Sequence, residues 1–228
     1  MIRALILDLD DTLYCETDFV ASGYRAVAKE LSVVCGRSHQ EIYQTMMSTL
    51  ERQGRRSVMP GVLECYPACG LHVADLVGIY RRHTPEIKLF PGYAELLKIL
   101  RCAYRLGIVT DGDPAVQRSK CAALGLDSFV DNIICTWEYG PEKEKPHPYS
   151  FCLMLACLQS EPEETLVIGD SVEKDCLGAR AAGLKCVRVQ KPQLKCGLSH
   201  VEKADFVIES LFQLPLVLRQ LEGRNEAA

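Results

Sequence analysis

Residues 3–13 read RALILDLDDTL, an apolar run that ends in three carboxylates and a threonine. The unbroken apolar core of this run predicts a strand over residues 3–9 that is buried on both faces of a parallel sheet. Carboxylates at the end of a buried strand are costly unless they are paired or bind a ligand. Asp8, Asp10 and Asp11 could form an ordinary turn, but their place at this strand end favours a functional site.

The same kind of apolar run recurs along the chain, and each run is followed by a helical pattern. We predict further strands over residues 105–110, 132–136, 165–169, 185–189 and 206–208. We predict helices over residues 92–103, 114–124, 148–158, 172–182 and 211–221, with Asp113 as an N-cap. This alternation is typical of an α/β fold with a doubly wound, Rossmann-like parallel sheet.

One segment breaks the alternation. Residues 15–89 contain helical periodicity, with helices expected over residues 19–31 and 72–82, and no convincing strand. Ser38 and Glu41 have the spacing of a capping box for another helix that continues to Leu50. We therefore predict an α/β catalytic core made of residues 1–14 and 90–228, and an inserted α-helical cap made of residues 15–89.

The composition excludes several classes of protein. The 228 residues carry 26 basic and 30 acidic side chains, a net charge of −4, which argues against a nucleic-acid partner. No apolar run reaches the length of a membrane helix, and the N-terminal apolar run is too short for a signal peptide. We expect a soluble, cytoplasmic protein with no membrane partner.

The chain has 12 cysteines but no Cys-x-x-Cys pair. Several of them have apolar neighbours, so we expect reduced cysteines that serve as small hydrophobic residues, with a metal or redox role as the alternative.

Functional residue types follow four of the predicted strands or their loops. Because the carboxyl ends of parallel strands meet at one edge of a sheet, these side chains should converge. Oxygen ligands without supporting His or Cys favour Mg²⁺, and a hydroxyl, backbone N–H groups and a lysine suit a phosphate. The set is typical of phosphoryl transfer. Besides Asp8, Asp10 and Asp11 after the first strand, this set of candidate site residues contains Thr110, Asp111, Gly112, Lys145, Asp170, Ser171 and Asp175.

In this order, the motifs resemble those of the haloacid dehalogenase-like hydrolase superfamily over nearly the whole chain. The first is the apolar strand with Asp8-x-Asp10-x-Thr12, and the second is the strand that ends at Thr110. The third is a lysine, best matched by Lys145 before Pro146, although Lys143 competes with it. The fourth is Gly-Asp-x-x-x-x-Asp, which runs from Gly169 to Asp175. Asp11 stands where the family often has glycine.

The resemblance implies a role for each residue. Asp8 would be the nucleophile that forms an aspartyl-phosphate, and Asp10 would be the general acid and base. Mg²⁺ would be held by Asp8, the backbone carbonyl of Asp10, and Asp170. Asp175 would be a water-mediated ligand or would orient the lysine, with Ser171 beside it. The transferring phosphate would bind Thr110, Lys145 and the backbone at Asp111 and Gly112.

Asp10 separates two chemistries within the superfamily, because the dehalogenase members lack an acid at this position. Its presence favours a phosphatase, and the helical cap favours a small phosphorylated metabolite as substrate. Two alternatives stay open: a phosphomutase that uses the same intermediate, and a non-enzymatic phospho-aspartate signalling or binding protein.

Overall fold

The computed structural model describes residues 1–190 and 204–225. Residues 1–15 and the described residues from 88 onward form one unit, which contains a six-stranded sheet in the order β3-β2-β1-β4-β5-β6 with all neighbouring strands parallel. The predicted doubly wound α/β fold is therefore confirmed. The strands are β1 (Ala4–Leu7), β2 (Arg105–Thr110), β3 (Asn132–Cys135), β4 (Thr165–Gly169), β5 (Lys185–Val189) and β6 (Phe206–Ile208).

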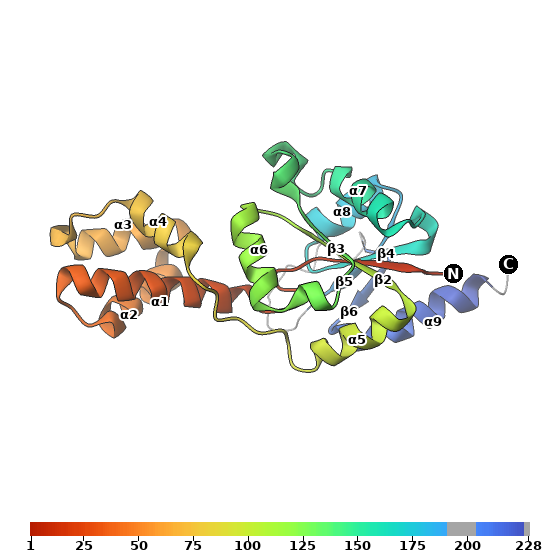
Figure 1. The fold of residues 1–228 in the computed structure, drawn as a ribbon, viewed down its shortest axis with the longest axis horizontal. Helices are drawn as coiled ribbons and strands as arrows, with labels where there is room; N and C mark the ends of the chain where they lie inside the picture. The colour runs from red at the N-terminus through yellow and green to blue at the C-terminus, as the bar shows by residue number, and fades with distance from the viewer. Residues whose placement is uncertain (191–203, 226–228) are drawn as a thin grey trace. The chain divides into compact units, whose positions relative to one another are not determined.

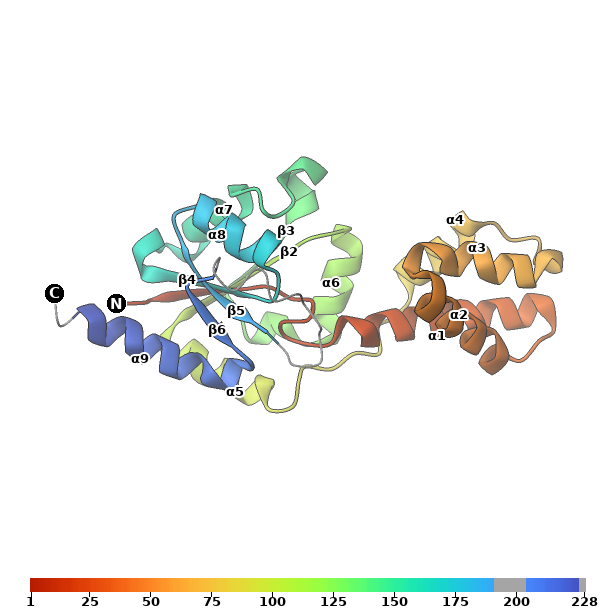
Figure 2. The same cartoon turned by 180° about the vertical axis from the view of Figure 1, so that it is seen from behind.

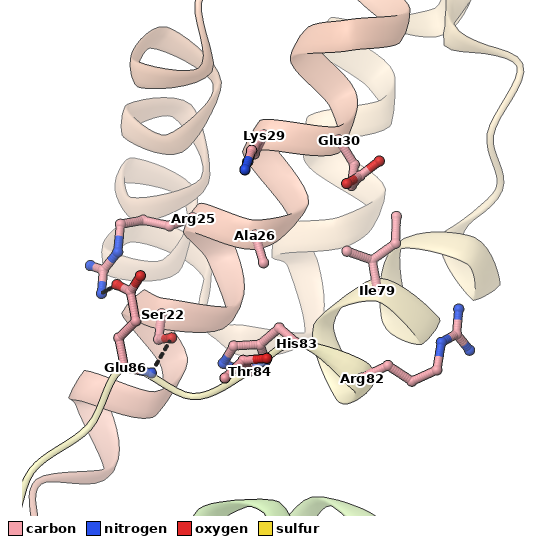
Figure 3. A pocket seen from close by; sticks show the side chains of 10 residues that line it. All are labelled: Ser22, Arg25, Ala26, Lys29, Glu30, Ile79, Arg82, His83, Thr84 and Glu86. Carbon is pink, nitrogen blue, oxygen red and sulfur yellow. Dashed lines mark hydrogen bonds and ion pairs between the residues drawn. The ribbon is translucent and has the colours of Figure 1, made fainter. Parts of the chain in front are cut away.

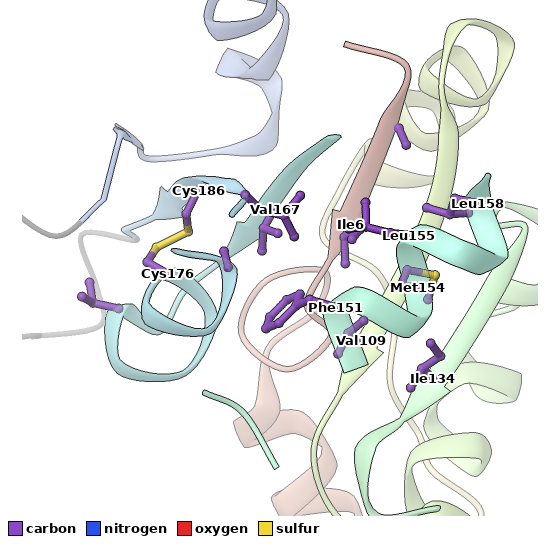
Figure 4. Packing of buried hydrophobic residues seen from close by; sticks show 14 residues of the cluster. Ile6, Val109, Ile134, Phe151, Met154, Leu155, Leu158, Val167, Cys176 and Cys186 are labelled. Carbon is purple, nitrogen blue, oxygen red and sulfur yellow. A yellow bond between two sulfur atoms is a disulfide. The ribbon is translucent and has the colours of Figure 1, made fainter. Parts of the chain in front are cut away.

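Helices cover both faces of this sheet. Helices α7 and α8 lie on one face, and α5 and α9 lie on the other (Figures 1 and 2). On the α7 side, Ile6, Val109 and Val167 of the sheet pack against Phe151 and Met154 of α7 (Figure 4). The helices of this unit are α5 (Tyr93–Ala103), α6 (Pro114–Ala123), α7 (Tyr149–Leu158), α8 (Leu177–Ala181) and α9 (Leu214–Asn225).

Local hydrogen bonding explains where α6 begins. The Asp113 carboxylate accepts hydrogen bonds from the backbone N–H groups of Ala115 and Val116, at 3.0 and 3.4 Å. The predicted N-cap is thus confirmed.

The helix expected over residues 172–182 is divided. A π-helical turn, η6 (Val172–Cys176), precedes the short helix α8. The Ser171 hydroxyl oxygen accepts from the N–H of Lys174 at 3.2 Å, and the Asp175 carboxylate accepts from the N–H of Ser171 at 3.1 Å. These bonds cap the wide turn with side chains, which periodicity alone does not predict.

Residues 16–87 form a compact helical unit, and the rest of the described chain forms the other unit. The helical unit has its own core, in which Leu31, Met46 and Val62 are fully buried. It therefore buries apolar surface without help from the sheet. Its helices are α1 (Glu16–Cys35), α2 (His39–Gln53), α3 (Arg55–Cys65) and α4 (Val73–Arg82).

The capping prediction in this unit is wrong. Ser38 is the N-cap of α2, but its side chain makes no capping hydrogen bond. A capping box instead forms at α4, where the N–H of His72 donates to the Asp75 carboxylate at 2.8 Å. Helix α3, which was not predicted as a separate element, is divided from α2 by Gly54, whose φ of 80° interrupts the helix.

The expectation of reduced cysteines is wrong for two of them. Cys176 of η6 and Cys186 of β5 form a disulfide with 5.2 Å between their Cα atoms (Figure 4). The packing of η6 on β5 brings the two thiols together, and this contact is not visible in their spacing along the chain. The nine other cysteines that the structure describes are free thiols, and Cys196 lies outside the described residues.

Within residues 1–190 and 204–225, no helix combines the length and the apolar character needed to span a bilayer.

Candidate active site

Asp8 follows β1 directly and is held at the centre of the sheet's carboxyl edge. Its backbone N–H donates to the carbonyl of Ile168 in β4 at 2.9 Å, and only 8% of the residue is exposed. The Thr12 hydroxyl donates to Asp8 Oδ2 at 3.2 Å. Thr12 reaches back because Asp11 has a φ of 54°, a left-handed conformation that glycine and aspartate tolerate better than most residues. This backbone turn explains why Asp11 can stand where glycine is common.

Lys145 lies beside Asp8. Its Nζ is 2.6 Å from Asp8 Oδ1, 2.7 Å from Asp175 Oδ1 and 3.2 Å from the carbonyl oxygen of Val109. The lysine is 4% exposed, and the two carboxylates hold its pKa above the ordinary value against the effect of burial. The competing Lys143 lies over the ring of Tyr149 instead.

Asp170 completes a group of three carboxylates with Asp8 and Asp175. Each of the three offers an oxygen that lies within 4.8 Å of the others. Burial, followed by the charges of Asp175 and Asp11, raises the pKa of Asp170 to about 7. Burial also raises the pKa of Asp8 well above its usual value, although Lys145 opposes the shift.

The charge and the donor atoms of this group show whether a metal ion would fit it. Among the residues that the structure describes, Lys145 is the one ammonium paired with this group, so the three carboxylates and Lys145 together carry excess negative charge when all are ionised. All the donors are carboxylate oxygens, which hard divalent cations prefer. A divalent cation at Asp8 and Asp170 would balance the charge that Lys145 leaves uncompensated, and the donor set fits it.

The side chain of Asp10 has different partners. Lys120 Nζ lies 2.7 Å from Asp10 Oδ1 and 3.0 Å from Oδ2, and Gln117 Nε2 lies 3.1 Å from Oδ2. The Tyr14 hydroxyl also donates to this carboxylate. Burial alone would raise the pKa of Asp10, but the Lys120 charge and the three hydrogen-bond donors lower it on balance. These contacts favour the ionised form of Asp10, which is the form that accepts a proton.

The residues expected to bind phosphate divide into two kinds. Thr110 ends β2, and its Oγ1 accepts from Gln117 Nε2 at 2.7 Å. The Asp111 carboxylate anchors neighbouring segments: it accepts from Thr136 at 2.8 Å, from the Lys145 N–H at 3.1 Å and from Lys174 Nζ at 3.1 Å. The backbone N–H groups at Asp111 and at Gly112, whose φ is 118°, are the groups that the sequence analysis predicts at a phosphate.

Sequence reasoning missed Gln117, Lys120, Thr136 and Lys174, and it named Thr12 in the first motif without giving it a role. Two of these were within reach of the sequence. Gln117 and Lys120 are three residues apart in α6, which begins beside the second motif, so they share one helix face. The spacing shows that the two residues share a helix face, but it does not show whether that face is turned toward Asp10 or toward solvent.

A separate cavity of about 540 Å³ lies within the helical unit. Figure 3 shows α1 side chains such as Arg25 and Lys29 on one side and His83 and Arg82 on the other. Arg25 is paired with Glu86 at 3.1 Å, and burial lowers the pKa of His83. Cationic and anionic groups are mixed here, so the lining does not select one class of ligand.

Comparison with known proteins adds to this geometry. Residues 2–183 match the family model described as haloacid dehalogenase-like hydrolase. A glyceraldehyde 3-phosphate phosphatase of Methanocaldococcus jannaschii is 28% identical over 97% of this chain and 99% of its own length. A ribulose-1,5-bisphosphate 5-phosphatase of Halopiger xanaduensis is 30% identical over 82% of this chain and 84% of its own. The solved structure of a HAD phosphatase from Thermococcus onnurineus is 26% identical, with a TM-score of 0.64 over 95% of this chain and 98% of that one.

Proposed function

The chain belongs to the haloacid dehalogenase-like hydrolases and is a phosphoric monoester hydrolase, and we propose that it is a Mg²⁺-dependent phosphatase of a small phosphorylated metabolite. The observation that carries the proposal is the group formed by Asp8, Lys145, Asp170 and Asp175 at one edge of the sheet. A nucleophilic carboxylate, a buried ammonium and a cation-binding pair of carboxylates are what phosphoryl transfer to an aspartate requires.

In the first half-reaction, Asp8 attacks phosphorus. A bond forms between its carboxylate oxygen and phosphorus, and the bond to the leaving oxygen breaks. Asp10, in its protonated form, gives that oxygen a proton, so that an alcohol leaves. Lys145 and Thr110 bind the phosphoryl oxygens, and the ammonium of Lys145 also opposes the growing charge.

In the second half-reaction, a water molecule attacks the phosphorus of the aspartyl-phosphate. Asp10 as a carboxylate takes the water proton, inorganic phosphate leaves, and Asp8 is regenerated. Asp8, Asp170 and the backbone carbonyl of Asp10 would hold Mg²⁺, which supplies neutralisation of the phosphoryl charge. Asp175 orients Lys145, an assignment supported by their 2.7 Å contact.

The names of the two curated relatives guide the proposed substrate. Both describe a phosphate on the terminal carbon of a short sugar or sugar bisphosphate. We infer a primary phosphate ester of a small hydroxylated metabolite. Such an ester releases a strongly basic alkoxide, which needs a general acid, and Asp10 supplies one. The helical unit of residues 16–87 is proposed as the cap that contributes substrate specificity.

A phosphate-release assay tests this function. The full chain is incubated with a panel of sugar phosphates, with Mg²⁺ or with a chelator, and Asp8→Asn serves as the inactive control. We expect release from terminal phosphates only with Mg²⁺ and only with Asp8 present. Phosphate release that is unchanged both by the chelator and by Asp8→Asn would overturn the mechanism.

The same assay separates the phosphomutase alternative. A mutase returns the phosphoryl group to the bound sugar, so an isomeric phosphate would accumulate with little inorganic phosphate. The signalling or binding alternative loses its support, because the chain belongs to a family of hydrolases.

A further inference from the structure

Two side chains of α6 contact the carboxylate of Asp10, and both are almost completely buried. Lys120 is 4% exposed and Gln117 is 2% exposed. Lys120 Nζ approaches both Asp10 oxygens, at 2.7 and 3.0 Å, whereas Gln117 Nε2 contacts only Oδ2, at 3.1 Å. The carboxylate is therefore fixed from the α6 side at both of its oxygens.

Gln117 also joins Asp10 to the second motif. Its Nε2 donates to Thr110 Oγ1 at 2.7 Å and to the backbone carbonyl of Asp111. Because the Thr110 oxygen accepts this bond, the proton of the hydroxyl remains available for a phosphoryl oxygen. The two N–H hydrogens of this amide are shared among three oxygens, so one side chain links the acid–base carboxylate to a phosphate-binding hydroxyl.

A role in stability alone explains the buried contact between Lys120 and Asp10 less well than a role in catalysis. A buried ion pair contributes little net stability compared with well-packed apolar side chains, because both charges must be desolvated. Here the buried ammonium lies against a carboxylate that is 26% exposed, at the catalytic edge. The lysine therefore restrains a group that stays accessible to a substrate.

We propose that Lys120 and Gln117 are positioning residues, which hold the Asp10 carboxylate where it exchanges a proton with the leaving oxygen and with the attacking water. This inference rests on the proposed phosphatase function. Neither residue touches the reacting atoms, and both act through Asp10 and, for Gln117, through Thr110.

The test compares two substrates that differ in their need for an acid. An alkyl phosphate such as glyceraldehyde 3-phosphate needs a proton on its leaving oxygen, whereas p-nitrophenyl phosphate leaves as a weakly basic phenolate. The value of kcat/KM reports the first half-reaction for each substrate. Lys120→Met should lower kcat/KM for the alkyl phosphate at least about tenfold more than for p-nitrophenyl phosphate, because general acid catalysis contributes about 10²–10⁴-fold.

A double-mutant cycle shows whether the effect passes through Asp10. When Asp10→Asn is already present, adding Lys120→Met should cause little further loss with either substrate. Equal losses for both substrates, or a Lys120→Met loss that persists undiminished beside Asp10→Asn, would overturn the proposal.

Two more variants keep the test decisive. Gln117→Met removes the amide without removing a charge, so it serves if Lys120→Met does not fold. It should lower kcat/KM for both substrates, because Thr110 loses its donor, and lower it further for the alkyl phosphate. Cys121→Ala changes a buried neighbour on α6 and should change kcat/KM for both substrates to the same extent.

If the wild-type chain hydrolyses neither substrate with Mg²⁺, the phosphatase function itself fails. If the wild type is active and Asp8→Asn is not, an equal loss for both substrates refutes only the positioning role.

Discussion

The ammonium of Lys145 lies 2.6 Å from the carboxylate of Asp8, although 137 positions separate them in the chain. The contact is buried, and the same ammonium lies 2.7 Å from Asp175. One cation therefore serves two carboxylates of the candidate active site. The third carboxylate, Asp170, has burial and further negative charge around it, which raises its pKa to about 7.

The first prediction concerns Lys145. Lys145→Met should abolish measurable phosphate release and lower the free energy of unfolding by about 3–5 kcal/mol, because two buried carboxylates lose their partner. Lys143→Met is the matched control, since Lys143 lies against Tyr149 and not at Asp8, and it should keep nearly full activity and stability. Kinetics and chemical denaturation check both variants. A loss in Lys143→Met equal to that in Lys145→Met would refute the assignment of the lysine.

The stability of the metal-free protein should depend on pH through Asp170. Its pKa is about 7 in the folded chain and about 3.9 in an unfolded one, so between these values the folded state binds a proton that the unfolded state does not. Stability that is present below about pH 4 is therefore lost as the pH rises to about 7. Thermal unfolding in a chelator should show a Tm that falls over this range, and Asp170→Asn should flatten the fall. An unchanged slope in Asp170→Asn would contradict this origin.

Mg²⁺ should stabilise the folded chain at neutral pH. A cation that binds only the folded state at about 100 times its Kd adds about 2.7 kcal/mol. We expect Mg²⁺ to raise the Tm of the wild type and a chelator to reverse the rise. Asp170→Asn should show a much smaller rise, because one of three carboxylates is removed. An equal rise in this variant would place the cation elsewhere.

Gly169 should not tolerate a side chain. A Cβ at this position would collide with the carboxylate of Asp175, so Gly169→Ala must displace the residue that orients Lys145. We expect loss of activity together with a lower Tm. Gly223→Ala in α9 is the matched control, because the added methyl group has no described atom within 4 Å apart from its chain neighbours and the backbone of its own helix. It should keep full activity and gain up to about 1 kcal/mol of stability from helix propensity. Normal activity in Gly169→Ala would contradict the close contact between Gly169 and the Asp175 carboxylate.

Much of the active edge could be predicted from short stretches of sequence. Asp8, Thr110 and Asp170 each follow an apolar run, and parallel strands carry such residues to a common edge. The sequence did not show which partners a given side chain takes. The backbone at Asp111 was expected at a phosphate, and the structure adds that the Asp111 carboxylate accepts from Thr136, the Lys145 backbone N–H and Lys174.

Other features depend on packing between distant segments. Nothing in the spacing of Cys176 and Cys186 distinguishes them from the nine free cysteines, and their disulfide depends on how η6 packs on β5. The helix pattern of Gln117 and Lys120 likewise fits a solvent-facing surface as well as a buried one.

Local sequence was enough to predict the order of the six strands, the helical insertion after the first of them, and the residue types at the strand ends. These follow from local periodicity and from the chemistry of each side chain, which neighbouring residues fix. The tertiary structure alone decided which carboxylate each lysine neutralises: Lys145 binds Asp8 and Asp175, and Lys120 binds Asp10. Those pairs form because sheet pairing and helix packing bring distant segments within 3 Å, and a charge removed from water requires a partner at that distance.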